Sequence, residues 1–116
     1  MKLALIVDDD PAIRDILSAV LRREGWIAES AIDGDDAIAM LKVKTYSIIV
    51  LDLLMPRIDG TGVLEFMKQQ DIATPVIVVA AAPDEKVLDP RIVRMVLKKP
   101  IEIGDLRTIL QAIKGT

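Results

Sequence analysis

Four charged side chains in this sequence stand where they could carry out chemistry together, because each follows a short apolar run. Asp8 and Asp9 close the first such run, Asp52 closes a run near the middle of the chain, and Lys99 closes one near the end. If these runs are parallel strands of one sheet, all four side chains lie at the sheet edge where ligands bind. Three acids and an amine at one such edge predict a phosphoryl-transfer site.

The apolar runs predict five β-strands, and the segments between them have the apolar spacing of helices. The first predicted helix has Asp10 as its N-cap and Pro11 in its first turn, and Gly25 is a suitable stop. Further helices are predicted after Asp33 and after Asp59. The predicted strands cover residues 3–7, 26–31, 47–51, 76–81 and 95–97, and the last helix covers about 103–113.

Strands that alternate with helices predict an α/β fold with a doubly wound, five-stranded parallel sheet in the order 2-1-3-4-5. The fourth helix is expected to be short or broken, because Pro83 and Pro90 bracket the segment 84–89 and proline inside a helix costs ~3 kcal/mol. A length of 116 residues is close to the commonest domain size, so residues 1–116 are interpreted as one domain.

Composition narrows both the class of protein and the kind of metal site. Hydrophobic residues make up 52% and charged residues 28% of the chain, which is typical of a soluble globular protein. Neither cysteine nor histidine occurs, so any metal must bind oxygen ligands, which favours magnesium. The first apolar run is too short for a signal peptide or a membrane span, and we expect a cytoplasmic protein. A formal charge of -3 argues against direct binding of nucleic acid.

A cation is expected among the acids, because crowded carboxylates repel one another and raise each other's pKa unless a positive charge is present. Magnesium favours octahedral oxygen coordination and usually takes one or two carboxylates together with phosphate oxygens. A carboxylate can also attack phosphorus and form an aspartyl-phosphate. Lys99 could reach the incoming phosphoryl group as a point charge.

Three motifs resemble the receiver domain of bacterial two-component response regulators. They are VDDDPAIR near the start, LDLLMPRIDG in the middle and KKPIE near the end, and the resemblance covers the whole chain. It implies the flavodoxin-like receiver fold, with Asp52 as the phospho-accepting aspartate. It also implies that Asp8 and Asp9 are the acidic pair that holds Mg²⁺ beside Asp52.

The same resemblance gives roles to residues around these acids. The backbone carbonyl of Leu54 would be a further metal ligand. Lys99 would contact the phosphoryl group, and its bond to Pro100 is commonly cis in the family. Pro56 and Gly60 match the loop that shapes the site after the third strand.

The expected function is that of a receiver in a two-component phosphorelay. A histidine kinase or a histidine phosphotransfer protein would supply the phosphoryl group to Asp52, and a downstream effector protein or domain would read the signal through protein contacts. Such a receiver assists its own phosphorylation and dephosphorylation and has no separate substrate.

Two residues depart from the family pattern and leave an alternative open. Ala80 stands where the family usually has a threonine or serine, and Val96 stands where it has a switching aromatic. Both favour a degenerate receiver that binds partners without phosphorylation, whereas the intact acids and Lys99 favour the phospho-accepting form. A phosphohydrolase on a similar sheet ranks last, because Leu54 stands where its second acid would be needed.

Overall fold

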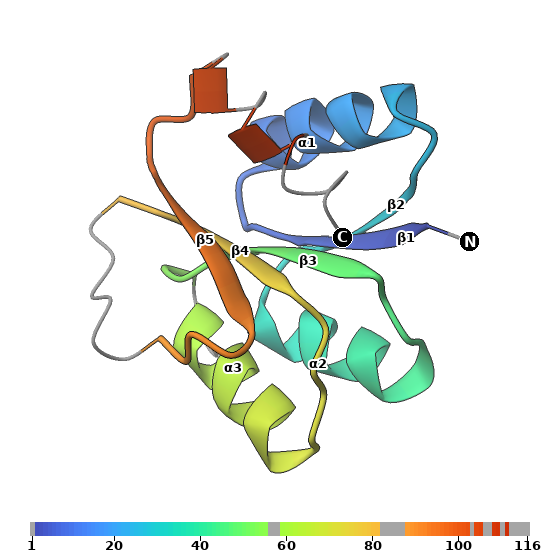
Figure 1. The fold of residues 1–116 in the computed structure, drawn as a ribbon, viewed down its shortest axis with the longest axis vertical. Coiled ribbons are helices and arrows are strands. Elements are labelled where there is room, and N and C mark those ends of the chain that lie inside the picture. Colours follow the sequence, from blue (N-terminus) through green and yellow to red (C-terminus); the bar gives the residue numbers. More distant parts are fainter. Residues whose placement is uncertain are drawn as a thin grey trace.

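The computed structural model describes residues 2–55, 59–81 and 88–102, together with residues 104, 105, 108, 109 and 111 (Figure 1). Its sheet has five parallel strands in the order β2-β1-β3-β4-β5, which confirms the predicted topology. The elements are β1 (Leu3–Val7), α1 (Pro11–Arg23), β2 (Ile27–Ala31), α2 (Gly34–Val43), β3 (Ile48–Asp52), α3 (Gly60–Gln69), β4 (Val76–Ala80) and β5 (Val93–Lys98).

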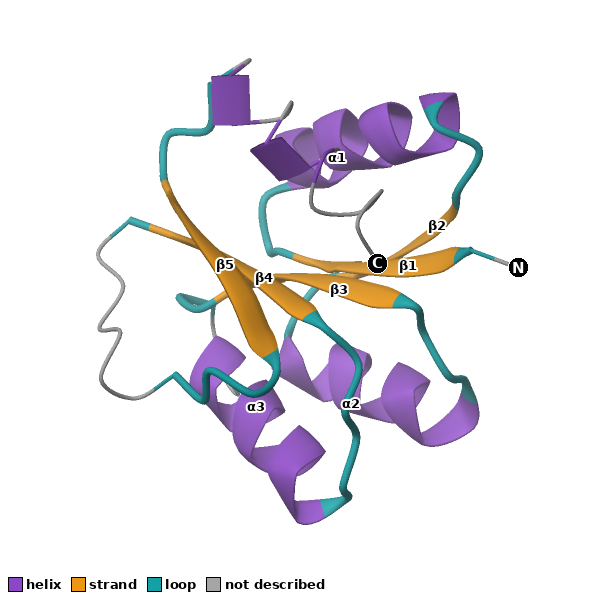
Figure 2. Ribbon diagram, in the orientation of Figure 1, coloured by secondary structure: helices purple, strands orange, loops and turns teal. Residues whose placement is uncertain are grey.

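Helices cover both faces of the sheet, with α1 on one face and α2 and α3 on the other (Figure 2). The strands β3 and β4 are buried along their whole length, which explains why their sequences are continuous apolar runs rather than alternating ones. On the α1 face, Leu17 and Leu21 of the helix pack on the sheet, and Ile109 near the carboxyl end of the chain joins them. Two separate apolar layers therefore lie between the sheet and the helices on its two faces.

The helices α1, α2 and α3 start where the sequence predicts. Asp10 accepts a hydrogen bond from the backbone N–H of Ala12 and Pro11 opens α1, while Asp33 and Asp59 cap α2 and α3 in the same way. After α1, Gly25 has a φ of 84°, a backbone conformation that glycine adopts without strain. These caps fix where each helix begins relative to the strand before it.

Four strands differ from the prediction at one or both ends, and β4 ends at Ala80, one residue earlier than predicted. Trp26 precedes β2, because its backbone N–H bonds back to Leu21 in the turn that ends α1. At the other end of the sheet, β5 is longer than predicted, since the exposed Arg94 interrupts its apolar pattern next to a register shift in the pairing with β4. Asp52 belongs to β3, where it pairs with Val79.

Two expected helices fall partly on residues that the structure does not describe. The segment 84–89 is described only at its last two residues, so the expectation of a short or broken fourth helix lies outside the described residues. Of the last helix, predicted over 103–113, the structure describes residues 104, 105, 108, 109 and 111, and all five are helical. Within the described residues, no helix has the length and apolar character needed to cross a membrane.

Candidate functional site

The three predicted acids meet at the carboxyl ends of the neighbouring strands β1 and β3. Val7 at the end of β1 pairs with Leu51 of β3, so Asp8 and Asp52 occupy the next position on neighbouring strands. Carboxylate oxygens of Asp8, Asp9 and Asp52 all lie within 4.8 Å of one another. The parallel register of two adjacent strands is therefore what brings together acids that are more than forty residues apart in the chain.

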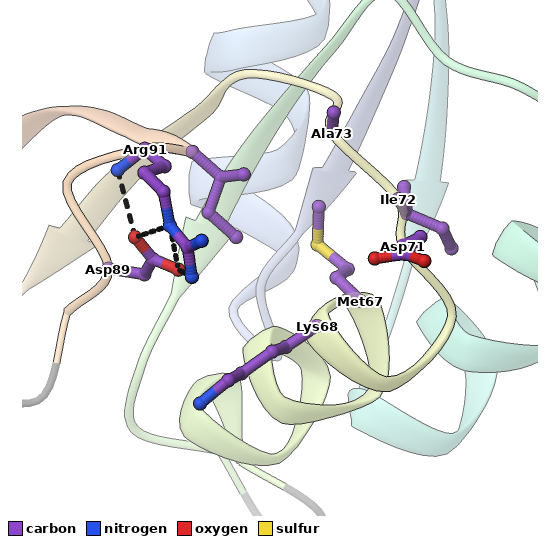
Figure 3. Close-up of a pocket in the computed structure, with 8 residues that line it drawn as sticks. Met67, Lys68, Asp71, Ile72, Ala73, Asp89 and Arg91 are labelled. Carbon is purple, nitrogen blue, oxygen red and sulfur yellow. Dashed lines mark hydrogen bonds and ion pairs between the residues drawn. The ribbon is translucent and has the colours of Figure 1, made fainter.

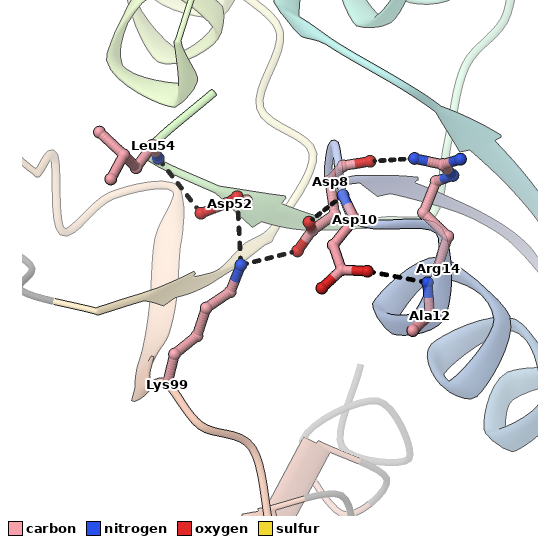
Figure 4. A network of polar contacts seen from close by, with 7 residues as sticks. All are labelled: Asp8, Asp10, Ala12, Arg14, Asp52, Leu54 and Lys99. Carbon is pink, nitrogen blue, oxygen red and sulfur yellow. Dashed lines mark hydrogen bonds and ion pairs between the residues drawn. The ribbon is translucent and has the colours of Figure 1, made fainter. Parts of the chain in front are cut away.

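Lys99 completes the cluster from the end of β5 (Figure 4). Its ammonium nitrogen lies 3.1 Å from Oδ2 of Asp8 and 3.2 Å from Oδ2 of Asp52. Its backbone N–H donates to the carbonyl of Ala80 at 2.9 Å, which continues the pairing of β5 with β4 to this point. The peptide bond between Lys99 and Pro100 is cis, as the family resemblance implied. All four predicted charged residues thus share one site.

Burial sets the electrostatics of Asp52, whose residue surface is only 3% exposed. Loss of solvation raises the pKa of its carboxyl group, and the charge of Asp8 raises it further. The backbone N–H of Leu54, which donates to Oδ1 at 3.1 Å, and the ammonium group of Lys99 act in the opposite direction. The net effect is a raised pKa for Asp52, and loss of solvation is its largest cause.

The pKa of Lys99 is raised for the complementary reason. Partial burial by itself lowers the pKa of this ammonium group, but the hydrogen bonds and charges of Asp8 and Asp52 outweigh that effect. Lys99 therefore stays protonated and available to an anionic group that enters the site.

Asp9 and Leu54 lie at the solvent side of the site. Asp9 is exposed, and among the described residues its carboxylate has no hydrogen bond or ion pair. The side chain of Leu54 is 75% exposed, while its backbone N–H holds Asp52. The geometry leaves the metal-ligand role of the Leu54 carbonyl as a prediction.

Gly60 is required by close contact with the strand that carries Asp52. A Cβ atom on Gly60 would lie 2.4 Å from the carbonyl oxygen of Asp52 and 2.6 Å from Cα of Leu53. The backbone N–H of Gly60 also donates to the carbonyl of Leu53 at 2.9 Å. The start of α3 therefore touches the backbone of the site directly. Pro56, the other loop residue that matched the family, lies outside the described residues.

Arg14 is the site neighbour that sequence reasoning missed. Its guanidinium Nη1 donates to the backbone carbonyl of Asp8 at 2.8 Å, while the backbone N–H of Asp10 donates to Oδ1 of Asp8 at 2.9 Å. The available signal was spacing, because Arg14 stands one helical turn after the N-cap Asp10, on the side of α1 that faces the loop.

The residues at the two departures are packed as apolar side chains. Ala80 is 3% exposed at the end of β4, and Val96 is half-buried against the core on the side of α2 and α3. Val96 pairs in register with Val78, one position away from the site along the strand. Ala80 has no hydroxyl group to donate to an anion at this strand end.

The chemistry of the donor set fits a hard divalent cation. All the candidate ligands are oxygens, they come within coordination reach of one another, and their combined charge exceeds that of Lys99. Magnesium prefers such oxygen ligands and accepts water at its remaining positions, which the exposed side at Asp9 allows.

A separate hollow lies at the opposite, amino ends of β4 and β5 (Figure 3). Lys68 at the end of α3 lines it, and Asp89 and Arg91 on its wall pair with each other at 2.8 Å. Among the described residues, only Asp8, Asp9 and Asp52 form a group of acids that could hold a metal ion, and none of these three lines the hollow.

A family model relates this chain to response regulators, and two similar relatives are named as transcriptional regulatory proteins. Residues 4–111 match the family model described as the response regulator receiver domain. The chain is 40% identical over 81 residues to the transcriptional regulatory protein ResD of Bacillus subtilis, covering 70% of the chain and 33% of ResD. It is 36% identical over 77 residues to the transcriptional regulatory protein TrcR of Mycobacterium tuberculosis, covering 66% of the chain and 30% of TrcR. The matched region thus spans about a third of these relatives.

Solved response-regulator structures have a similar fold over nearly the whole of this chain. The receiver domain of the Francisella response regulator 1452 has a TM-score of 0.85 and 27% identity, with 99% of this chain and 98% of that one covered. The response regulator TrrA of Thermotoga maritima, solved in complex with Mg²⁺ and BeF, has a TM-score of 0.82 and 25% identity, with 97% and 99% covered.

Proposed function

Because the chain belongs to the response-regulator receiver domain family, we propose that residues 1–116 form a phospho-accepting receiver of a two-component phosphorelay. A phosphohistidine on a histidine kinase or a histidine phosphotransfer protein would supply the phosphoryl group, and Asp52 would accept it. The observation that carries this proposal is the buried carboxylate of Asp52, held between the N–H of Leu54 and the ammonium group of Lys99.

The transfer is a displacement at phosphorus. One carboxylate oxygen of Asp52 attacks, and an O–P bond forms as the P–N bond to the donor imidazole breaks. The imidazole nitrogen keeps the electron pair of that bond and takes up a proton. Lys99 offers its positive charge to the oxygens of the incoming group, at the place where it now holds Asp8 and Asp52.

We further propose that Asp8, Asp9, Asp52 and the carbonyl of Leu54 hold Mg²⁺. When bound, the ion offsets the charge of the carboxylates and of the phosphoryl oxygens, which lowers the barrier to bringing two anions together. The grouping of three carboxylates around the single positive charge of Lys99 supports this assignment.

The receiver would pass its signal on through protein contacts with a downstream effector protein or domain, in the cytoplasm and without binding nucleic acid itself. It would assist the formation and loss of its own aspartyl-phosphate and act on no separate substrate. The relatives ResD and TrcR are named as transcriptional regulators, which supports an effector of that general kind.

A degenerate receiver is the second candidate, and the buried methyl of Ala80 is the observation that favours it. A methyl group cannot donate a hydrogen bond to a phosphoryl oxygen. One contact that would link phosphorylation to a change of conformation is therefore missing. In that case partner binding would be the same with and without a phosphorylated Asp52.

Intact mass after incubation with phosphoramidate and Mg²⁺ tests the proposal, because this small donor carries the same P–N bond as phosphohistidine. The wild type should gain one phosphoryl group, whereas Asp52→Asn should gain none and remain folded. Asp9→Ala should lose magnesium affinity and gain the group far more slowly. A full adduct on Asp52→Asn would exclude Asp52 as the acceptor, and an unmodified wild type would favour the degenerate receiver.

A further inference from the structure

The loop between β1 and α1 is held by contacts to Asp8 rather than by contacts to Asp9. Asp8 accepts from the N–H of Asp10 through Oδ1 and from Lys99 through Oδ2, and its backbone carbonyl accepts from Arg14 at 2.8 Å. The exposed carboxylate of Asp9 has no partner within the described part of the chain. Whatever directs Asp9 towards the other two acids must therefore act through its backbone.

The Arg14 contact acts on that backbone. The carbonyl of Asp8 belongs to the peptide unit that joins Asp8 to Asp9, and a peptide unit is planar. Fixing the direction of this carbonyl consequently fixes the plane that carries the backbone nitrogen and Cα of Asp9. The donor, Arg14, is half-buried in the first turn of α1, and α1 is anchored to the sheet by Leu17. Figure 4 shows the guanidinium directed at the carbonyl, while the carboxylate of Asp8 turns to Lys99.

We propose that Arg14 is a positioning residue that orients the Asp8–Asp9 peptide unit and thereby sets the affinity of the acidic cluster for a divalent cation. This inference rests on the proposed magnesium site. It assigns a role to the arginine of the VDDDPAIR motif that neither helix formation nor charge requires. The guanidinium of Arg14 donates to one backbone oxygen, the carbonyl of Asp8.

Simple electrostatics makes the opposite prediction, which allows a sharp test. Arg14 places a positive charge near a cation site, so its removal should tighten magnesium binding if charge is all that matters. If Arg14 positions Asp9, its removal should weaken binding, by about tenfold or more as for other groups that orient metal ligands. The sign of the change separates the two accounts.

The experiment is a titration of the full chain with Mg²⁺ alone, followed by amide NMR shifts. Arg14→Met removes the donors and the charge, and we expect its dissociation constant to rise by about tenfold or more. Arg14→Lys keeps the charge and one donor and should recover most of the affinity. Arg22→Met is the matched control, because Arg22 donates to the carbonyl of Ala28 at 3.3 Å from the other end of α1, and its affinity should stay within about twofold of wild type.

The metal-free spectra provide a second measurement. The amide resonance of Asp9 should shift in Arg14→Met and stay in place in Arg22→Met, and urea unfolding confirms that each variant is folded. If Arg14→Met does not fold, Arg14→Gln replaces it, since glutamine is too short to span the same distance. An unchanged or lower dissociation constant for Mg²⁺ in the folded Arg14 variant would overturn the inference, as would a wild type that does not bind Mg²⁺.

No phosphodonor is present in this titration, so its result is separate from that of the proposed function. Weaker binding in Arg14→Met together with a wild type that phosphoramidate does not modify would support the positioning role and refute phospho-acceptance. An Asp52 adduct in the wild type, together with equal magnesium affinities of wild type and Arg14→Met, would support phospho-acceptance and refute the positioning role.

Discussion

Replacing Asp52 with asparagine should stabilise the protein in the absence of metal. The side chain of Asp52 is 2% exposed, and burial together with the charge of Asp8 raises its pKa despite the N–H of Leu54 and the ammonium of Lys99. A raised pKa means that the folded protein prefers the uncharged carboxyl group. Asparagine has the same shape without the charge, so it should remove the penalty of burying an ion.

Two opposing contributions set the magnitude. The variant loses the charged hydrogen bond to Lys99 at 3.2 Å, worth ~1.5–3 kcal/mol, but Lys99 keeps its contact with Asp8. It also avoids a desolvation penalty of several kcal/mol per buried ion. Because the pKa is raised, desolvation is the larger contribution, and we expect a net gain of about 1–3 kcal/mol in the free energy of unfolding at pH 7.

The dependence on pH has a definite sign. Between the ordinary pKa of aspartate and the raised pKa of Asp52, the folded state binds more protons than the unfolded state, so wild-type stability falls as pH rises through that window. Below the ordinary pKa of aspartate, Asp52 is protonated in both the folded and the unfolded state, and the gain in stability from Asp52→Asn should vanish. Above the raised pKa the gain should be complete and constant.

Urea unfolding in EDTA from pH 3.5 to pH 8 measures this difference, with Asp15→Asn, an exposed acid on α1, as the control. An Asp52→Asn variant that is no more stable than wild type at pH 7, or whose stability has the same slope with pH, would show that burial of the Asp52 charge carries no net penalty. Magnesium at ten times its dissociation constant should stabilise the wild type by ~1.4 kcal/mol and narrow the gap.

Three further perturbations test other parts of the molecule. Gly60→Ala should reduce the free energy of unfolding by about 2 kcal/mol, because its methyl collides with the β3 backbone; a urea midpoint equal to wild type would show that the loop relaxes freely. Burial and the hydrogen bond to Glu29 raise the pKa of Tyr46, the single tyrosine. Glu29→Gln should therefore lower the midpoint pH at which the absorbance of the tyrosine changes in a pH titration, and an unchanged midpoint pH would contradict the assigned cause. Beryllofluoride with Mg²⁺ should shift amides around the acids and leave most of β5 unmoved, whereas Ala80→Thr with Val96→Tyr should extend the response there, since a charged hydrogen bond of ~1.5–3 kcal/mol moves a two-state equilibrium roughly ten- to a hundredfold. Large shifts along wild-type β5 would reveal a switch of another design.

The sheet and the acidic cluster were predictable because they depend on features that a sequence displays directly. A strand buried on both faces has to be apolar along its whole length, as β3 and β4 are, and capping residues such as Asp10 and Asp33 mark helix starts. Once the strand order is known, residues at strand ends such as Asp8 and Asp52 have only one edge at which to meet.

Other features depend on geometry that a linear pattern does not contain. The contact from Arg14 to a backbone carbonyl requires both the turn of the loop and the conformation of a long side chain. The close approach of Gly60 to Asp52 follows from how α3 returns to β3, and the sequence shows only that glycine is present. The length of β5 was missed because Arg94 breaks its apolar pattern at an irregularity in strand pairing.

Whether Asp52 accepts the phosphoryl group is tested by identifying the phosphorylated residue chemically. Protein incubated with phosphoramidate and Mg²⁺ is treated with borohydride, which reduces an aspartyl-phosphate to homoserine, and is then digested and sequenced by mass spectrometry. If Asp52 is the acceptor, homoserine should appear at position 52 alone, and only when both the donor and Mg²⁺ are present. Homoserine at position 8 or 9, or its complete absence from protein that binds Mg²⁺, would contradict the assignment of Asp52 as the acceptor.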